Sequence, residues 1–201
     1  QDEWRTLPEH DRATMKARQG VRYHLQSQVA VLNPETMQPV PADGETIGEI
    51  MFRGNICMKG YLKNEKATRE AFAGGWFHTG DIGCIDEQGY VHYLGRRKEM
   101  LKVNGMSVFP AEIEAMLGKH PAILGSAVVG RADEHRGQLP VAFVMLRPAA
   151  VGTLDSATLT GWCRENMAGY KVPIVRIVDA LPLTATGKVR KQDLAPLAEQ
   201  L

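Results

Sequence analysis

The sequence of 201 residues lacks several features that would define its class at once. Its three cysteines, at positions 57, 84 and 163, are odd in number and widely spaced, which fits neither a disulfide framework nor a metal knuckle. No apolar run approaches the roughly 18 residues of a membrane helix, and the first residues do not form a secretory signal. The net charge is only +1 and aromatic residues make up 6%, which argues against a nucleic-acid partner. These absences predict a folded, cytoplasmic protein with no transmembrane segment.

Several catalytic signatures are also missing. The six histidines show no pair at helical ligand spacing, so no metal site is predicted, and no G-x-S-x-G segment is present. Residues 181–191 (LPLTATGKVRK) are not a phosphate loop, because Pro182 stands where a glycine is required and Val189 where a serine or threonine would bind magnesium. What remains is a hydroxyl-rich loop that presents Lys188, either as a charge for a phosphate or carboxylate or as an ordinary exposed lysine.

The pattern of turns and apolar residues predicts two halves with a boundary at Gly95. The first half is β-rich, with one short helix and a turn at residues 86–89. The second begins with a hairpin around Asn104-Gly105, a typical tight-turn pair, and continues as an α+β sandwich. The strands are expected at residues 28–32, 48–53, 90–94, 98–109 (a strand pair), 126–130, 141–146 and 174–178, and the helices at residues 64–72, 110–117, 156–167 and from 190 onward. The predicted domains are residues 1–95 and 96–201.

Two further segments carry candidate binding residues. In residues 75–81 (GWFHTGD), the Asp81 carboxylate could accept hydrogen bonds from both hydroxyls of a sugar diol. The alternative is an ordinary aspartate in a turn, which would give the same sequence pattern. Residues 95–105 (GRRKEMLKVNG) place Arg96, Arg97, Lys98 and Lys102 beside a glycine turn. Such a cluster suits a polyphosphate, and the alternative is a solvated charged face.

The order of these segments resembles that of a known enzyme family. The stretches GEIMFRG, KGYL, GWFHTGD, GYVHYLGRRKEMLKVNG, FPAEIE and LPLTATGK, which lie between about Gly48 and Leu194, are together similar to the acyl-adenylate-forming superfamily and, within it, to acyl-CoA synthetases. The resemblance implies an α+β fold in which a β-rich, barrel-like end of the large N-terminal domain precedes a small α+β sandwich, the C-terminal lid. It also implies an ATP-dependent ligase that forms acyl-AMP and then acyl-CoA.

The resemblance assigns a role to individual residues of this sequence. Asp81 looks like the aspartate that holds the ribose hydroxyls of ATP, and Arg96 like the arginine that supports the same ribose. Lys98 is similar in position to the hinge about which the lid turns. Lys102 and Gly105 lie on the hairpin that lines the pantetheine tunnel for thioester formation. Lys188 resembles the catalytic lysine of the adenylation step.

The resemblance also implies what the chain does not contain. The glycine-, serine- and threonine-rich loop that cradles the phosphates, and the glutamate segment that helps to bind Mg²⁺, have no match here. The expectation is a C-terminal fragment that is inactive alone and belongs to an enzyme using ATP with Mg²⁺, CoA and a carboxylic acid, expected to be a fatty acid. Two alternatives remain: an enzyme that loads the phosphopantetheine of a carrier protein, and a non-catalytic lid-like module that binds CoA or a protein.

The two ends of the match differ in the acyl length they indicate. Residues 16–23 (KARQGVRY) are similar to ligases for short or medium chains, whereas residues 95–109 are more similar to ligases for long chains. The sequence leaves acyl length open.

Overall fold

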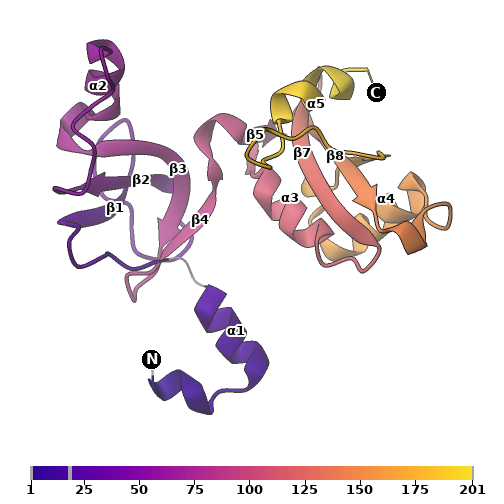
Figure 1. The fold of residues 1–201 in the computed structure, drawn as a ribbon, viewed down its shortest axis with the longest axis horizontal. Helices are drawn as coiled ribbons and strands as arrows, with labels where there is room; N and C mark the ends of the chain where they lie inside the picture. The colour runs from indigo at the N-terminus through magenta and orange to yellow at the C-terminus, as the bar shows by residue number, and fades with distance from the viewer. Residues whose placement is uncertain (1, 18–19, 201) are drawn as a thin grey trace. The chain divides into compact units, whose positions relative to one another are not determined.

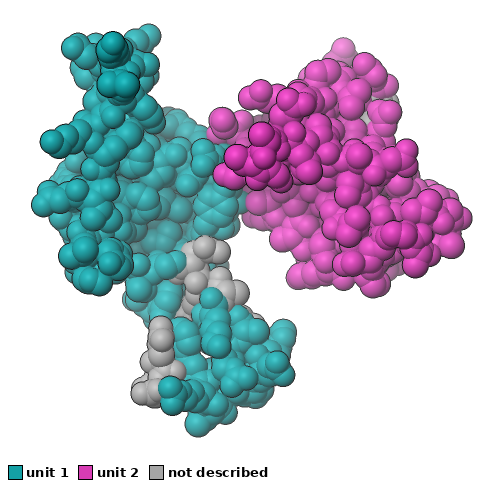
Figure 2. All heavy atoms as spheres, viewed as in Figure 1, with its two compact units in different colours: residues 1–97 teal, residues 98–201 magenta. Residues whose placement is uncertain are grey.

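The computed structural model describes residues 2–17 and 20–200. The chain divides into two compact units, residues 1–97 and residues 98–201, which Figure 2 colours separately. Each unit is described by itself below. The α+β class expected from the sequence is confirmed, and no described helix is long and apolar enough to cross a membrane.

The first unit is built on an antiparallel sheet whose strands follow the order of the chain, β1-β2-β3-β4 (Figure 1). These strands are β1 (Gln28–Leu32), β2 (Gly48–Arg53), β3 (Phe77–Ile85) and β4 (Val91–Arg96). Val31, Ile50 and Val91 form its buried cluster. The positive φ of Gly89, +81°, allows the tight turn between β3 and β4 that the sequence predicts.

Helices of the first unit lie outside this sheet. Helix α2 (Glu65–Ala71) begins where expected, because the Asn64 side chain accepts a hydrogen bond from the Ala67 N–H and caps it. Helix α1 (Glu9–Ala17) and the short 3₁₀ helices η1 (Asp2–Thr6) and η2 (Ala73–Gly75) were not predicted. The prediction of a single helix in this half is therefore wrong. Residues 18 and 19 of the segment 16–23 lie outside the described residues.

The second unit is a mixed sheet covered by helices. Its strands are β5 (Leu101–Val103), β6 (Met106–Val108), β7 (Ile123–Asp133), β8 (Gly137–Leu146) and β9 (Ile174–Ile177). The order is β6-β5-β8-β7, and β9 runs parallel to β8. The helices are α3 (Pro110–Leu117), α4 (Ser156–Asn166) and α5 (Lys191–Ala198), and 3₁₀ turns span Arg97–Glu99 (η3), Pro148–Ala150 (η4) and Gly169–Lys171 (η5).

Alternation along β7 and β8 explains why helices cover both faces of this sheet. Successive strand residues point to opposite faces, so Val128 and Val144 pack with α3 and α4, whereas Val129 and Phe143 pack with α5. Figure 1 shows α3 and α5 beside β7. The two apolar faces give the sandwich that the sequence predicts, and they fix α5 through its buried Leu194.

Two local predictions need correction. Residues 98–109 were expected to begin as a strand at Lys98, but η3 continues through Glu99 and β5 starts only at Leu101. Asp81 was expected after a strand or in a turn, whereas it lies inside β3 opposite Arg96 of β4. The positive φ of Gly80, +72°, disturbs the strand just before Asp81 without ending it. The glycines near Asp81 therefore gave a misleading turn signal.

Candidate active site

Asp81 and Arg96 meet across the β3–β4 pair. The Arg96 Nε atom lies 2.9 Å from Asp81 Oδ1 in an ion pair. The contact is not a well-aligned hydrogen bond, and the buried Oδ1 atom has no hydrogen-bond partner in residues 2–17 and 20–200. The Asp81 side chain is 30% exposed. The pair therefore presents a carboxylate with unused acceptor capacity next to a guanidinium.

Strand β2 holds Asp81 in place from the neighbouring strand. The Thr79 hydroxyl donates to the Ile50 carbonyl over 2.6 Å, and its oxygen accepts the Asp81 N–H at 3.0 Å. The Gly80 N–H donates to Glu49 Oε1 at 2.9 Å. These bonds fix the backbone before and at Asp81, so the direction of its carboxylate is set by β2 as well as by β4.

Glu49 is a buried carboxylate whose other oxygen faces an imidazole and a guanidinium. Its side chain is only 3% exposed, and Oε2 lies 3.3 Å from His78 Nδ1 and 3.8 Å from Arg97 Nη1. An unpaired buried charge is costly, so these partners matter for its stability. Arg97 immediately precedes Lys98, and the same carboxylate that fixes Gly80 thus also holds the residue before the predicted hinge. Sequence reasoning did not single out Glu49.

Lys102 and Gly105 lie on the predicted hairpin, which the structure confirms. Strands β5 and β6 pair around Asn104 and Gly105, whose φ values of +51° and +78° are typical of a two-residue hairpin turn. The Lys102 Nζ atom donates to Ser107 Oγ across the strands over 2.8 Å. A side chain at Gly105 would meet no atom within 4 Å, so the backbone conformation, rather than lack of space, requires glycine there.

Lys188 is exposed on a loop whose base is closed by backbone pairing. The Thr184 N–H donates to the Lys188 carbonyl at 2.7 Å, and the Lys188 N–H donates to Thr184 Oγ1 at 3.0 Å. Gly187, at φ +79°, makes the turn. The Lys188 ammonium has no hydrogen-bond or ion-pair partner in the described part of the chain. The loop therefore presents a free positive charge from a defined backbone.

Lys98 and the Lys188 loop border one open cavity of about 600 Å³ in the second unit. Its lining includes Lys98, Leu101, Val129, Thr184, Arg190 and Lys191. The structure thus brings Lys98 close to the base of the loop, and it brings Asp81 together with Arg96. No hydrogen bond or ion pair within the described ranges joins Lys188 to Lys102 or Gly105.

An ion-pair cluster beside this cavity was missed by the sequence analysis. Lys191 Nζ lies 2.8 Å from Glu114 Oε1 and 3.1 Å from Glu99 Oε2. Burial alone would lower the pKa of Lys191, but the hydrogen bonds and charges of Glu114 and Glu99 outweigh it and raise the pKa, so the ammonium is retained at neutral pH. Glu114 could be noticed in the sequence only as an acid near a helix start, and Lys191 carried no signal.

No group of three or more potential metal ligands occurs among the residues that the structure describes.

Comparison with known proteins places this geometry in a family. Residues 112–188 match the family described as "AMP-binding enzyme C-terminal domain". An acetate–CoA ligase of Humulus lupulus is 42% identical over 202 residues, which are 99% of this chain and 36% of the relative. A peroxisomal acetate/butyrate–CoA ligase of Arabidopsis thaliana is 42% identical over 203 residues, with the same two coverages. This chain belongs to the acyl-adenylate-forming superfamily.

Solved members of the superfamily share the fold of this chain. ATP-bound MatB from Rhodopseudomonas palustris superposes with a TM-score of 0.81 at 33% identity, covering 90% of this chain and 36% of that protein. The chain thus spans about a third of the length of these relatives and matches their C-terminal region. The resemblance noted from the motifs is confirmed, while the roles of Asp81, Arg96, Lys98, Lys102, Gly105 and Lys188 stay predictions.

Proposed function

We propose that this chain is the C-terminal part of an AMP-forming ligase that joins a short-chain carboxylic acid to CoA. The observation that carries the proposal is the free ammonium of Lys188, held on a closed loop in one unit, while the Asp81–Arg96 pair lies in the other. The ligase names of the relatives support the same reaction class. In this proposal residues 1–97 end the adenylating domain and residues 98–201 form its lid.

In the proposed first half-reaction, a carboxylate oxygen attacks the α-phosphorus of ATP. The new bond joins oxygen to phosphorus, and the bond to the β-phosphate breaks to release pyrophosphate. Two anions must approach each other, so the ammonium of Lys188 between them would both orient them and reduce their repulsion. Asp81 would accept hydrogen bonds from the two ribose hydroxyls, and Arg96 would hold that carboxylate in position. Mg²⁺ accompanies ATP, and its ligands are expected in the part of the enzyme that this chain does not include.

In the proposed second half-reaction, the CoA thiol attacks the acyl carbon and AMP leaves. Here Lys188 has no comparable task, because the leaving group is AMP and the nucleophile is sulfur. The hairpin of Lys102 and Gly105 would line the approach of the pantetheine arm. The exposed Gly105, which has no side chain, would leave this approach open, and the lid would turn about Lys98 to exchange one face for the other.

The nucleotide role of Asp81 gives a separate prediction. Asp81→Asn keeps the size of the side chain but replaces a charged acceptor by an amide, and hydrogen bonds to a charged group contribute roughly 1.5–3 kcal/mol. We expect the KM for ATP to rise about tenfold or more in the full-length ligase, with kcat changed less. Asp133→Asn, at a turn aspartate of the second unit, is the matched control. An unchanged KM for ATP would remove Asp81 from the nucleotide site.

The function itself is tested by a panel of carboxylic acids. We expect the full-length ligase to release pyrophosphate fastest with acetate, propionate or butyrate and at least about tenfold more slowly with octanoate or palmitate, because pocket size discriminates by such factors per methylene. The names of the relatives, an acetate–CoA ligase and an acetate/butyrate–CoA ligase, support the shorter of the two acyl lengths that the sequence left open. The 201-residue chain alone should release none.

The outcomes of this panel separate the alternatives. Acid-independent pyrophosphate release would argue against adenylation, and palmitate as the best substrate would overturn the short-chain assignment. Acyl-AMP that passes its acyl group to a phosphopantetheine carrier protein but not to CoA would favour the carrier-loading alternative. A full-length protein that binds CoA but forms no acyl-AMP would be the non-catalytic module. The cytoplasmic setting stays a prediction.

A further inference from the structure

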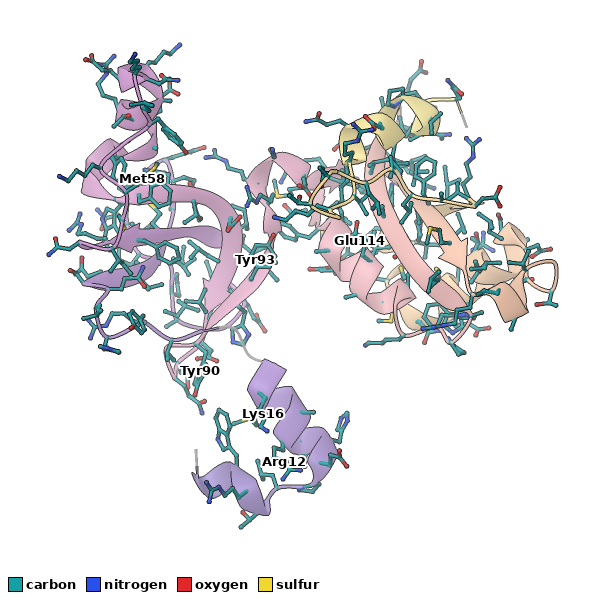
Figure 3. The ribbon with its side chains drawn as sticks, in the orientation of Figure 1. Arg12, Lys16, Met58, Tyr90, Tyr93 and Glu114 are labelled. Atoms are coloured by element: carbon teal, nitrogen blue, oxygen red, sulfur yellow. The ribbon has the colours of Figure 1, made fainter. Side chains whose placement is uncertain are left out.

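The ammonium of Lys191 joins three segments of the second unit. Lys191 is the first residue of α5, Glu99 is the last residue of η3, and Glu114 lies on α3, where Figure 3 labels it. The ammonium lies within 3.1 Å of both carboxylates. Residues 99 and 191 are 92 positions apart, so this contact is one of the longest-range polar links in the fold.

The cluster is anchored to the sheet rather than to a mobile surface. Glu114 Oε1 also accepts the Val128 N–H of β7 at 2.8 Å, so the carboxylate that binds Lys191 is itself held by the central strands. The side chains of Lys191 and Glu114 are 26% and 25% exposed. The raised pKa of Lys191 agrees with an ammonium that both carboxylates hold continuously.

The Lys188 loop ends directly at this anchor. Between Lys188 and Lys191 lie two residues, and the Arg190 N–H donates to the Pro182 carbonyl at 2.8 Å, which closes the loop on its other side. Beyond the anchor, α5 is seated on the sheet by buried Leu194. The position of the loop therefore depends on where the first turn of α5 is held. Lys191 supplies the contacts of that turn with η3 and α3, whereas Arg190 and Asp193 pair within the turn itself, 2.8 Å apart.

We infer that Lys191 is a positioning residue for Lys188, which fixes the start of α5 to Glu99 and Glu114 so that the loop is presented at a constant place in the lid. The inference rests on the proposed function. Glu99, Glu114 and Lys191 all belong to residues 98–201. The three side chains would therefore move together with the lid as it turns. Their contacts hold the catalytic loop in register with the segment that follows the hinge residue Lys98.

If Lys191 only stabilised the fold, a comparable Lys–Glu pair elsewhere in the unit should matter equally for adenylation. The chain offers such a pair as a matched control. Lys171 of η5 forms a second Lys–Glu pair with Glu112 of α3, at 2.5 Å and with a similarly half-buried lysine. Its pKa is raised by the same kind of partner, although burial opposes this. Lys171 is not part of the Lys188 loop or of α5. Removing it should affect folding much as removing Lys191 does, without moving Lys188.

The test compares Lys191→Met, Lys191→Arg, Lys171→Met and Lys188→Ala in the full-length ligase. We expect Lys191→Met to lower the kcat of carboxylate-dependent ATP–pyrophosphate exchange at least about tenfold, since a misplacement of 1 Å can cost about 100-fold. The KM values and CoA transfer from preformed acyl-AMP should stay within about threefold. Lys191→Arg should restore most of the exchange rate, and Lys171→Met should leave both half-reactions near wild type.

A milder variant keeps the test valid if Lys191→Met does not fold. Glu99→Gln removes one of the two charges and should lower exchange about fivefold while CoA transfer stays at the wild-type rate. Equal losses in both half-reactions, or the same loss in Lys171→Met, would overturn the inference while leaving the function in place. A wild-type ligase that forms no acyl-AMP would overturn the proposed function, and this inference with it.

Discussion

Lys188→Ala is expected to lower carboxylate-dependent ATP–pyrophosphate exchange by about 100- to 1000-fold, the effect typical of removing one preorganised group that stabilises transition-state charge. The Lys188 ammonium has no partner within the described residues, so its loss breaks no contact of the fold and should leave the free energy of unfolding within about 0.5 kcal/mol of wild type. Any large loss of exchange therefore reports on chemistry rather than on stability.

The second half-reaction provides the internal control. With preformed acyl-AMP supplied, transfer to CoA should proceed within about threefold of the wild-type rate, because the phosphate substitution that needs the ammonium has already taken place. Lys119→Ala, at another exposed lysine of the same unit, should change neither half-reaction. If Lys188→Ala slowed both half-reactions equally, the lysine would not be the adenylation residue, and a general effect on the lid would be the better explanation.

Local chemistry made much of the second unit predictable. The Asn104-Gly105 turn and the proline at the start of α3 each act within a few residues, and the structure shows both where expected. The consecutive apolar residues of β7 and β8 likewise mark these segments as buried strands, as the structure shows them. Features of this kind depend on neighbouring residues, so sequence suffices for them.

The missed features depend on neighbours that the sequence does not reveal. Helix α1 is short and largely polar, so it carries little of the apolar periodicity by which helices are recognised. The Lys191 cluster unites α3, α5 and η3, and no local pattern links them. Glu49 shows the same limit, because a glutamate inside an apolar strand pattern reads as a surface position until the fold reveals its burial and its contact with the Gly80 N–H.

The candidate site also contains features that neighbouring residues determine and features that distant segments determine. The pairing of Asp81 with Arg96 follows from the register of one hairpin, and the residue types suggested a nucleotide site before that register was known. The closure of the Lys188 loop by Thr184 and the anchoring of α5 were not predictable, because both depend on the path of the chain between distant segments. Residue identity thus points to chemistry, while the fold supplies the positions that make the chemistry effective.

Lys98→Pro is expected to block one half-reaction by at least about 100-fold while leaving the other within about threefold. The division between the two units falls between Arg97 and Lys98, and Lys98 is exposed within η3. Proline fixes its own φ near −65° and disfavours helical backbone at the residue before it, which here is Arg97. A lid that must adopt two orientations would then keep only the one compatible with the restricted backbone.

The comparison with Lys98→Ala separates the backbone from the side chain. Alanine removes the ammonium but leaves φ free, so it should retain both half-reactions within about threefold if Lys98 acts as a hinge. The two steps are measured separately, as acyl-AMP formed in a single turnover without CoA and as thioester formed from supplied acyl-AMP. Equal inhibition of both by proline would indicate a folding defect, and full activity would mean that the lid turns elsewhere. Arg97 pairs with buried Glu49 in the first unit and Glu99 pairs with Lys191 in the second, so we expect the turn at Lys98, the residue between them.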